Sequence, residues 1–292
     1  MTNNKKGKIP VKGNLLISGA GRVEELRPRL IEAAGGPDAR ILMVPSNHGL
    51  KQSQDTQEGW PIVPEFKDGG AFEVDIEDPD FKRNWHWMVH WYQDFGVPNG
   101  AVLHTDHRDI ADSDEFCDHI RTADAVFFTG GTPSKMMPTY LHTQAHGAFQ
   151  ELIDRGGAVA GWSAGASIQG DWSSDTEEKP FTEMFGFLPD VCIKTHFLKW
   201  NCQSDMARIV EKRHEVLGLG LDERAAIAVS GDEFEVFGTS YVAVYDYNKV
   251  LLPDGKYYLI GPGDRYSLTE RKVVGEPKTY IKKVVERKWS EI

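Results

Sequence analysis

Short apolar runs alternate with longer stretches of helical period along most of the chain. The pattern predicts a buried strand over residues 14–18, a helix over 24–34 and a second strand over 40–45. Further buried strands are predicted at 100–104, 125–129, 158–161 and 191–195. Strands that alternate with helices in this way are typical of a parallel sheet with helices on its faces.

Helical spacing of apolar residues predicts further helices at 83–95, at 114–123, up to about 155, and at 205–214. Residues 217–222 are apolar and short enough for a strand or a turn. Residues 225–262 alternate between apolar and polar, which favours antiparallel hairpins. Residues 48–80 are polar, rich in Asp, Gly and Pro, and have no sustained period, so we expect an insertion or a long loop near a functional face.

The order of these elements predicts an α/β fold, a three-layer sandwich with a mostly parallel sheet and antiparallel hairpins at its C-terminal end. No internal repeat or Ser/Pro-rich linker interrupts the pattern. We therefore expect a flexible N-terminal tail over 1–12 and one catalytic domain over 13–292.

Composition and charge narrow the function classes. Hydrophobic residues make up 40% and charged residues 26% of the chain, as in an ordinary globular protein. The balance of 33 Lys and Arg against 44 Asp and Glu gives a net charge of −11, which repels phosphate backbones, so we expect no nucleic-acid partner. Three cysteines without a CxxC spacing indicate neither a disulfide framework nor a zinc cluster.

The N-terminal residues are polar and lack the apolar segment of a signal peptide, and no apolar run of about 18 residues could span a bilayer. We expect a cytoplasmic protein with no membrane partner, with the alternative of an exported protein whose signal peptide is missing from this sequence.

Ser163 is the candidate nucleophile, in the sequence Gly-Trp-Ser-Ala-Gly over residues 161–165. A predicted strand precedes it and a predicted helix follows, which is the setting of a nucleophile elbow. The sharp turn exposes the hydroxyl, the small residues at Gly161 and Gly165 relieve crowding, and the N-terminal end of the helix favours developing negative charge. The alternative is a tight turn whose serine only caps the helix.

A serine hydroxyl needs a base and an acid that orients the base. Of the ten histidines, His196 is best placed, because it follows an apolar strand and the ends of such strands gather sites. Asp222 and Glu223 follow the next short apolar run, and the residues alone leave both open as the acid.

The N–H groups of Gly131, after the predicted strand 125–129, and of Ala164, next to the serine, are suited to an oxyanion hole. Histidines at 104 and 107 and in the aromatic segment 85–90 do not form a metal-ligand pattern. We therefore expect neither a metal nor a cofactor.

The order serine, histidine, acid differs from that of α/β-hydrolases. Together with further motifs it resembles the cyanophycinase and dipeptidase E family of serine peptidases (peptidase family S51), and the cyanophycinase branch fits best. The motifs that carry the resemblance lie at 13–17, 39–41, 127–131, 160–166, 196–198, 217–223 and 261–266. It implies a fold related to class I glutamine amidotransferases (flavodoxin-like), a triad of Ser163, His196 and Glu223, and a homodimer.

The departures from the cyanophycinase branch concern substrate contacts. That branch has Asp-Gln where this chain has Lys194-Thr195, an arginine-rich segment around Trp200, and Asp after the glycine pair where this chain has Thr132. We expect these four residues to contact the substrate. A pair of opposite local charge cannot hold the same group, so cyanophycin is not the expected substrate.

These observations predict a serine peptidase that cleaves an amide bond in a small peptide, such as one with an aspartyl or isoaspartyl residue, through an acyl-enzyme. Two alternatives remain open. One is an esterase or amidase with the same triad, and the other is a binding protein on the same fold that has lost catalysis.

Overall fold

The computed structural model describes residues 7, 9–45, 99–105, 107–173, 182–247 and 257–276. The predicted insertion at 48–80 and the predicted helix at 83–95 lie outside these residues. Within the described part of the chain, no helix has the length and apolar character to cross a membrane.

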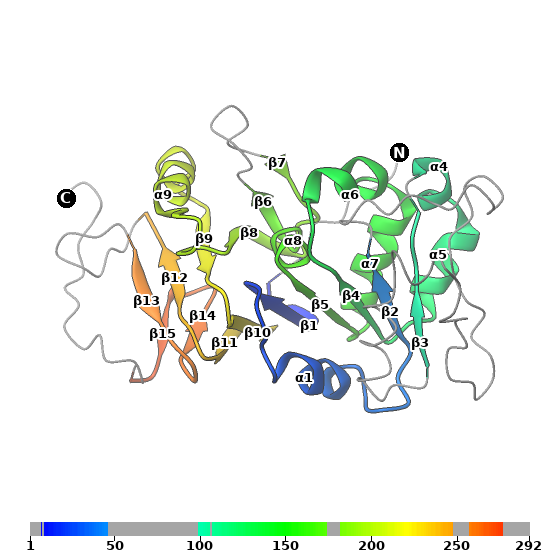
Figure 1. The fold of residues 1–292 in the computed structure, drawn as a ribbon, viewed down its shortest axis with the longest axis horizontal. Helices are drawn as coiled ribbons and strands as arrows, with labels where there is room; N and C mark the ends of the chain where they lie inside the picture. Colours follow the sequence, from blue (N-terminus) through cyan, green and yellow to red (C-terminus); the bar gives the residue numbers. More distant parts are fainter. Residues whose placement is uncertain are drawn as a thin grey trace.

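The larger of two sheets combines a parallel and an antiparallel half (Figure 1). The parallel half consists, in spatial order, of β1 (Val11–Ser18), β5 (Ala158–Trp162), β4 (Ala125–Phe128), β2 (Ile41–Val44) and β3 (Gly100–Val102). The antiparallel half continues from β1 through β10 (Ala225–Gly231), β11 (Glu233–Gly238), β14 (Arg265–Ser267) and β15 (Lys272–Val274). The carboxyl ends of β1, β4 and β5 therefore meet at one edge of the sheet.

The second sheet is also mixed. Its strands are, in spatial order, β13 (Tyr258–Ile260), β12 (Val242–Tyr245), β9 (Leu217–Leu221), β8 (Leu188–Thr195), β6 (Gly170–Ser173) and β7 (Thr182–Glu183). The three central strands β9, β8 and β6 are parallel. β12 pairs antiparallel with β9, β13 with β12, and β7 with β6.

The fold is thus an α/β fold with mixed sheets, and the prediction of one mostly parallel sheet is wrong. The predicted strands at 191–195 and 217–222 exist, but they belong to the second sheet. The predicted hairpins at 225–262 are antiparallel as expected, although β10–β11 joins one sheet and β12–β13 the other.

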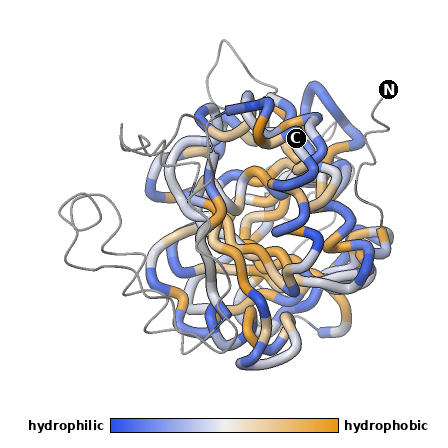
Figure 2. The backbone as a smooth tube through the Cα atoms, turned by 90° about the vertical axis from the view of Figure 1, so that its right-hand side faces the viewer, coloured by the Kyte–Doolittle hydropathy of each residue, from blue (hydrophilic) through white to orange (hydrophobic). Residues whose placement is uncertain are grey.

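Helices cover both faces of the parallel half of the larger sheet, and the last of the described helices packs on the second sheet. They are α1 (Leu26–Ala33), α4 (Arg108–Ala111), α5 (Asp114–Arg121), α6 (Pro133–Tyr140), α7 (Gln144–Asp154), α8 (Ala164–Ser167) and α9 (Gln203–Lys212). Leu15 and Ile17 of β1 pack in the cluster with α5 and α7, whereas Leu16 between them packs with Leu26 and Leu30 of α1. Apolar stretches gather inside the molecule and polar ones lie mostly outside (Figure 2).

The cores of the two sheets are continuous on one side. Val191 and Ile193 of β8 join the same large cluster as Leu15, while Cys192 between them packs in a separate cluster with Met206 of α9. Because alternate residues of β8 are buried on opposite faces, this strand is fixed in register up to its last residue. The prediction of one domain with a tail up to residue 12 stays a prediction, although β1 already begins at Val11.

Candidate active site

Ser163 lies in the sharp turn between β5 and α8. Its φ of 50° and ψ of −118° fall in a region that residues with a side chain rarely adopt. The turn is held by its backbone, because the N–H of Ser163 donates to the carbonyl of Ser18 at 3.0 Å and its own carbonyl accepts from the N–H groups of Ala166 and Ser167. This strained strand-to-helix turn is the geometry predicted for a nucleophile elbow.

The glycines on either side of Ser163 allow α8 to pack directly on the neighbouring strand. A Cβ atom at Gly161 would lie 2.3 Å from the carbonyl oxygen of Gly165, and one at Gly165 would lie 2.1 Å from that of Phe128. The prediction that both glycines relieve crowding is confirmed.

His196 follows the last residue of β8 and reaches Ser163 from the second sheet. The Nε2 atom of His196 lies 2.8 Å from the Oγ atom of Ser163. The backbone N–H of His196 donates to the carbonyl of Gly19 at 3.3 Å, which ties it to the loop after β1. The site is therefore assembled where the ends of β1, β5 and β8 meet.

Glu223, in the turn between β9 and β10, is the acid that faces the histidine. Its Oε1 atom lies 3.0 Å from the Nδ1 atom of His196. The neighbouring Asp222 instead accepts from the backbone N–H groups of Leu198 and Lys199 at 3.0 and 3.3 Å. Of the two carboxylates that the residues alone left open, the one in contact with His196 is Glu223.

With Nδ1–H donating to Glu223, Nε2 carries the lone pair and accepts the Ser163 hydroxyl proton. This arrangement can activate an alcohol as a nucleophile.

Two residues of the turn after His196 contact the triad: Lys199 binds Glu223, and Trp200 packs on His196. The Nζ atom of Lys199 lies 2.6 Å from Oε1 of Glu223, and the hydrogen bonds from Lys199 and then from His196 lower the pKa of that carboxyl. The indole of Trp200 stacks on the imidazole, with ring centroids 3.9 Å apart, and is 60% exposed. Sequence reasoning missed Lys199, whose only signal is its position three residues after His196.

The predicted oxyanion donors flank the elbow. Gly131 follows the end of β4 with a φ of 126°, and Ala164 is the first residue of α8. Neither N–H donates a hydrogen bond to another described residue. The loop that carries Gly131 touches the elbow, because a Cβ atom at Gly130 would lie 3.4 Å from the Cβ atom of Ser163.

The four predicted substrate contacts differ in placement. Thr132, at the start of α6, and Trp200 are exposed. Thr195 is buried, and its hydroxyl lies 3.4 Å from that of Ser167 on α8, so it packs against the helix that follows Ser163. The Lys194 side chain is 16% exposed and its Nζ atom lies 4.0 Å from Asp205 of α9.

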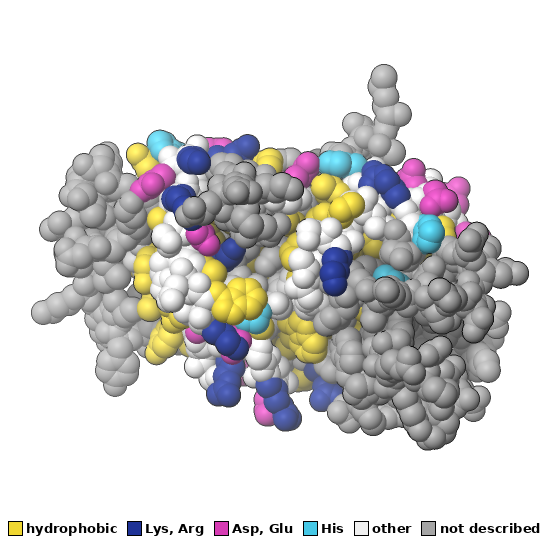
Figure 3. All heavy atoms as spheres, turned by 45° about the horizontal axis from the view of Figure 1, so that its top comes forward, with side chains coloured by type: hydrophobic (Ala, Val, Ile, Leu, Met, Phe, Trp, Pro, Cys, Tyr) yellow, Lys and Arg dark blue, Asp and Glu magenta, His cyan; other side chains and the backbone are white. Residues whose placement is uncertain are grey.

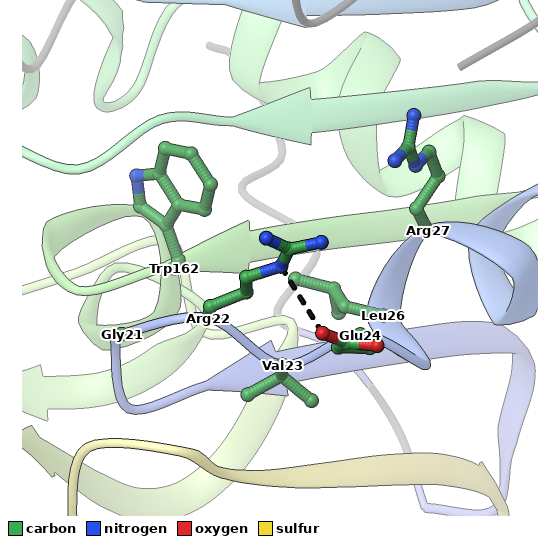
Figure 4. Close-up of a pocket in the computed structure, with 7 residues that line it drawn as sticks. All are labelled: Gly21, Arg22, Val23, Glu24, Leu26, Arg27 and Trp162. Atoms are coloured by element: carbon green, nitrogen blue, oxygen red, sulfur yellow. Dashed lines mark ion pairs between the residues drawn. The ribbon is translucent and has the colours of Figure 1, made fainter. Parts of the chain in front are cut away.

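A pocket of about 370 Å³ opens beside the elbow (Figure 4). It is lined by Gly21, Arg22, Val23, Glu24, Leu26, Arg27 and Trp162. Trp162 directly precedes Ser163, and a Cβ atom at Gly21 would lie 3.5 Å from that of Glu223. Arg22 and Arg27 line the pocket together with Glu24, which pairs with Arg22 at 3.3 Å. On the face in Figure 3, basic and acidic side chains lie interspersed.

No group of three or more His, Cys, Asp or Glu among the described residues could hold a metal ion. The three cysteines are buried and form no disulfide among these residues, and burial raises the pKa of Cys117 to about 12 and also raises that of Cys202. These two remain protonated at neutral pH and are not competing nucleophiles.

Comparison with known proteins agrees with the resemblance expected from the motifs. The model of peptidase family S51 matches residues 86–237, which include Ser163, His196 and Glu223. A cyanophycinase from Geminocystis herdmanii is 23% identical over 269 residues, which cover 84% of this chain and 88% of that protein. A cyanophycinase from Trichormus variabilis is 22% identical over 209 residues, 63% of this chain and 70% of that protein.

Among solved structures, a peptidase from an acI-B1 actinobacterium has the same fold. The TM-score is 0.64 with 23% sequence identity, and the match covers 89% of this chain and 98% of that one.

Proposed function

Because the chain belongs to peptidase family S51, we propose that it is a serine peptidase that cleaves an amide bond in a small peptide through an acyl-enzyme. The observation that carries the proposal is the continuous hydrogen-bonded line from Ser163 Oγ through both nitrogens of His196 to Glu223 Oε1, at 2.8 and 3.0 Å. Nucleophile, base and orienting acid are the groups that acyl transfer requires.

In the first half of the reaction, the Oγ atom of Ser163 forms a bond to the carbonyl carbon of the peptide while His196 takes the hydroxyl proton. Glu223 holds the resulting imidazolium in place. The C–N bond then breaks, and the amine leaves with the proton from His196. In the second half, water attacks the ester on Ser163, with His196 again as the base, and releases the carboxylic acid product.

The N–H groups of Gly131 and Ala164 would stabilise the negative oxygen of both tetrahedral intermediates. Ala164 directly follows Ser163, and Gly131 follows Gly130, which lies against Ser163; neither N–H donates to another described residue. A single donor of this kind contributes about 10²–10³-fold to kcat.

For the substrate, we propose a peptide with an acidic group, such as an aspartyl or isoaspartyl residue. The pocket lined by Arg22, Arg27 and Trp162 supports this, because guanidinium groups beside Ser163 suit a carboxylate. The exposed ion pair of Arg22 with Glu24 is weak, so a substrate carboxylate can replace it at little cost.

We also propose a fold related to class I glutamine amidotransferases. The parallel strands covered on both faces by α1, α5 and α7 support this relation.

The proposal is tested by hydrolysis of matched aspartyl, isoaspartyl and neutral short peptides, followed by chromatography. Ser163→Ala and His196→Gln should each lower kcat by about 10⁴–10⁶-fold, and the double variant should be no slower than either. Ser230→Ala, on the exposed side of β10, is the matched control and should keep full activity. Turnover by Ser163→Ala at the rate of the unmodified protein would exclude the serine mechanism. Absence of turnover for every peptide would instead favour the binding protein that the sequence left open.

A further inference from the structure

One carboxylate oxygen contacts two side chains in this site. The Oε1 atom of Glu223 lies 3.0 Å from Nδ1 of His196 and 2.6 Å from Nζ of Lys199. In a serine–histidine–acid arrangement the acid orients the base and stabilises its protonated form. A lysine bound to the same oxygen affects both the orientation of His196 and the stability of its protonated form.

The backbone holds Lys199 in position for this contact. The carboxylate of Asp222, next to Glu223 in the chain, accepts from the N–H groups of Leu198 and Lys199. The turn is closed further by the N–H of Cys202, which donates to the carbonyl of Phe197 at 3.0 Å. Exposed ion pairs are usually weak because two long side chains must be ordered. Here the carboxylate of Asp222 already holds the backbone of Lys199 next to Glu223, so part of that ordering is already present.

The other charged groups near Glu223 are few among the described residues. Asp222 is directed at backbone N–H groups, as described above. On the loop after β1, Arg22 pairs with Glu24, and the Cγ atom of Arg224 lies beside Gly21. The lowered pKa of Glu223 has Lys199 as its larger cause and His196 as its second. Lys199 and Glu223 are therefore the charged side chains that act most directly on His196.

We propose that Lys199 is a positioning residue that fixes the Glu223 carboxylate on His196 and offsets its negative charge, so that the base stays active at lower pH. This inference rests on the proposed serine mechanism. With Lys199 present, protonation of His196 changes the summed charge of His196, Glu223 and Lys199 from neutral to positive. Without Lys199, it would change the summed charge of His196 and Glu223 from negative to neutral. A nearby like charge disfavours protonation, so Lys199 keeps His196 able to accept the Ser163 proton in more acidic solution.

The reaction of Ser163 with a fluorophosphonate tests this without knowledge of the peptide. The Oγ atom forms a bond to phosphorus, the P–F bond breaks, fluoride leaves and His196 takes the proton. The second-order rate constant is measured by intact mass from about pH 5 to pH 9, the range in which a histidine base titrates. The proteins compared are the unmodified chain, Lys199→Met, Lys199→Arg and Lys272→Met. Lys272 is the matched control, because it is 58% exposed like Lys199 and pairs with Glu270 at 2.7 Å far along the chain in β15.

We expect the acid limb of the Lys199→Met profile to move to higher pH by about half a unit at low salt, the size of one charge acting through a nearly aqueous medium. The plateau rate should fall several-fold because Glu223 loses its anchor. The shift should shrink in about 0.5 M salt, since exposed charges are screened. Lys199→Arg should restore the limb, and Lys272→Met should match the unmodified protein.

The possible results distinguish the role of Lys199 from the serine mechanism itself. A Lys199→Met profile that superimposes on the unmodified one overturns the inference and leaves the serine mechanism standing. Equal loss at every pH, without rescue by Lys199→Arg, also overturns it, because the role would then be packing alone. Failure of the unmodified, folded protein to react at all would overturn the proposed function itself.

Discussion

Alanine at Gly165 tests how closely the elbow must pack on β4. A Cβ atom there would lie 2.1 Å from the carbonyl oxygen of Phe128 and 2.7 Å from that of Thr129. Both contacts are with backbone, so no flexible side chain can move away. The helix α8 and the end of β4 would have to separate by about 1 Å to restore ordinary van der Waals contact.

Gly165→Ala is expected to lower both the stability and the activity of the protein. Forcing a methyl group into a packed site costs about 1–3 kcal/mol of the free energy of unfolding, or about 2–6 °C in Tm for a chain of this size. The same shift separates Ser163 from the loop that carries Gly131, and a displacement of about 1 Å in a catalytic group lowers kcat/KM by about 10²-fold.

The assay pairs thermal unfolding with peptide hydrolysis or fluorophosphonate reaction. Gly147→Ala is the matched control, because Gly147 is exposed in α7 and a Cβ atom there meets nothing within 4 Å. This control should gain about 0.5–1 kcal/mol from helix propensity and keep its activity. If Gly165→Ala were as stable and as active as the unmodified protein, the reasoning on close packing of α8 against β4 would be refuted.

Three further predictions concern Glu223 and Trp200, two side chains in contact with His196 besides Ser163. Glu223→Gln should lower kcat by about 10⁴-fold, because an amide can hold His196 in the wrong tautomer; a loss below tenfold in steady-state kinetics would contradict the role of the acid. Since Lys199 and His196 lower the pKa of Glu223, its contacts stabilise the fold above the ordinary value of 4.5 and cease to do so as pH falls through the lowered value. The Tm deficit of Glu223→Gln should therefore be present at neutral pH and vanish in acid, and a pH-independent deficit would refute this. Trp200→Ala removes the ring on His196 and should lower kcat/KM about tenfold, whereas Tyr241→Ala, another exposed aromatic, should not.

The positions of Ser163 and His196 could be predicted because each directly follows a buried strand, and the ends of strands gather in one place. Local sequence alone leaves Asp222 and Glu223 open, because both lie in one turn and only side-chain direction separates them; it was the family resemblance that implied Glu223. Lys199 was missed for the same reason, since a turn has no period that fixes where a side chain points.

The placement of β8 shows a second limit of the sequence. Its apolar run predicts a buried strand, but a buried strand has the same pattern in either sheet. The same ambiguity affects Lys194 and Thr195 at its end. Their side chains point to α9 and to α8, which depends on how these helices pack and not on the local sequence.

The most direct test of the central claim is to locate the fluorophosphonate adduct by peptide mass spectrometry. The account predicts one adduct on the folded protein, on Ser163, which is lost in Ser163→Ala and forms far more slowly in His196→Gln. An adduct on another residue, or none under conditions that label a known serine hydrolase, would contradict Ser163 as the nucleophile.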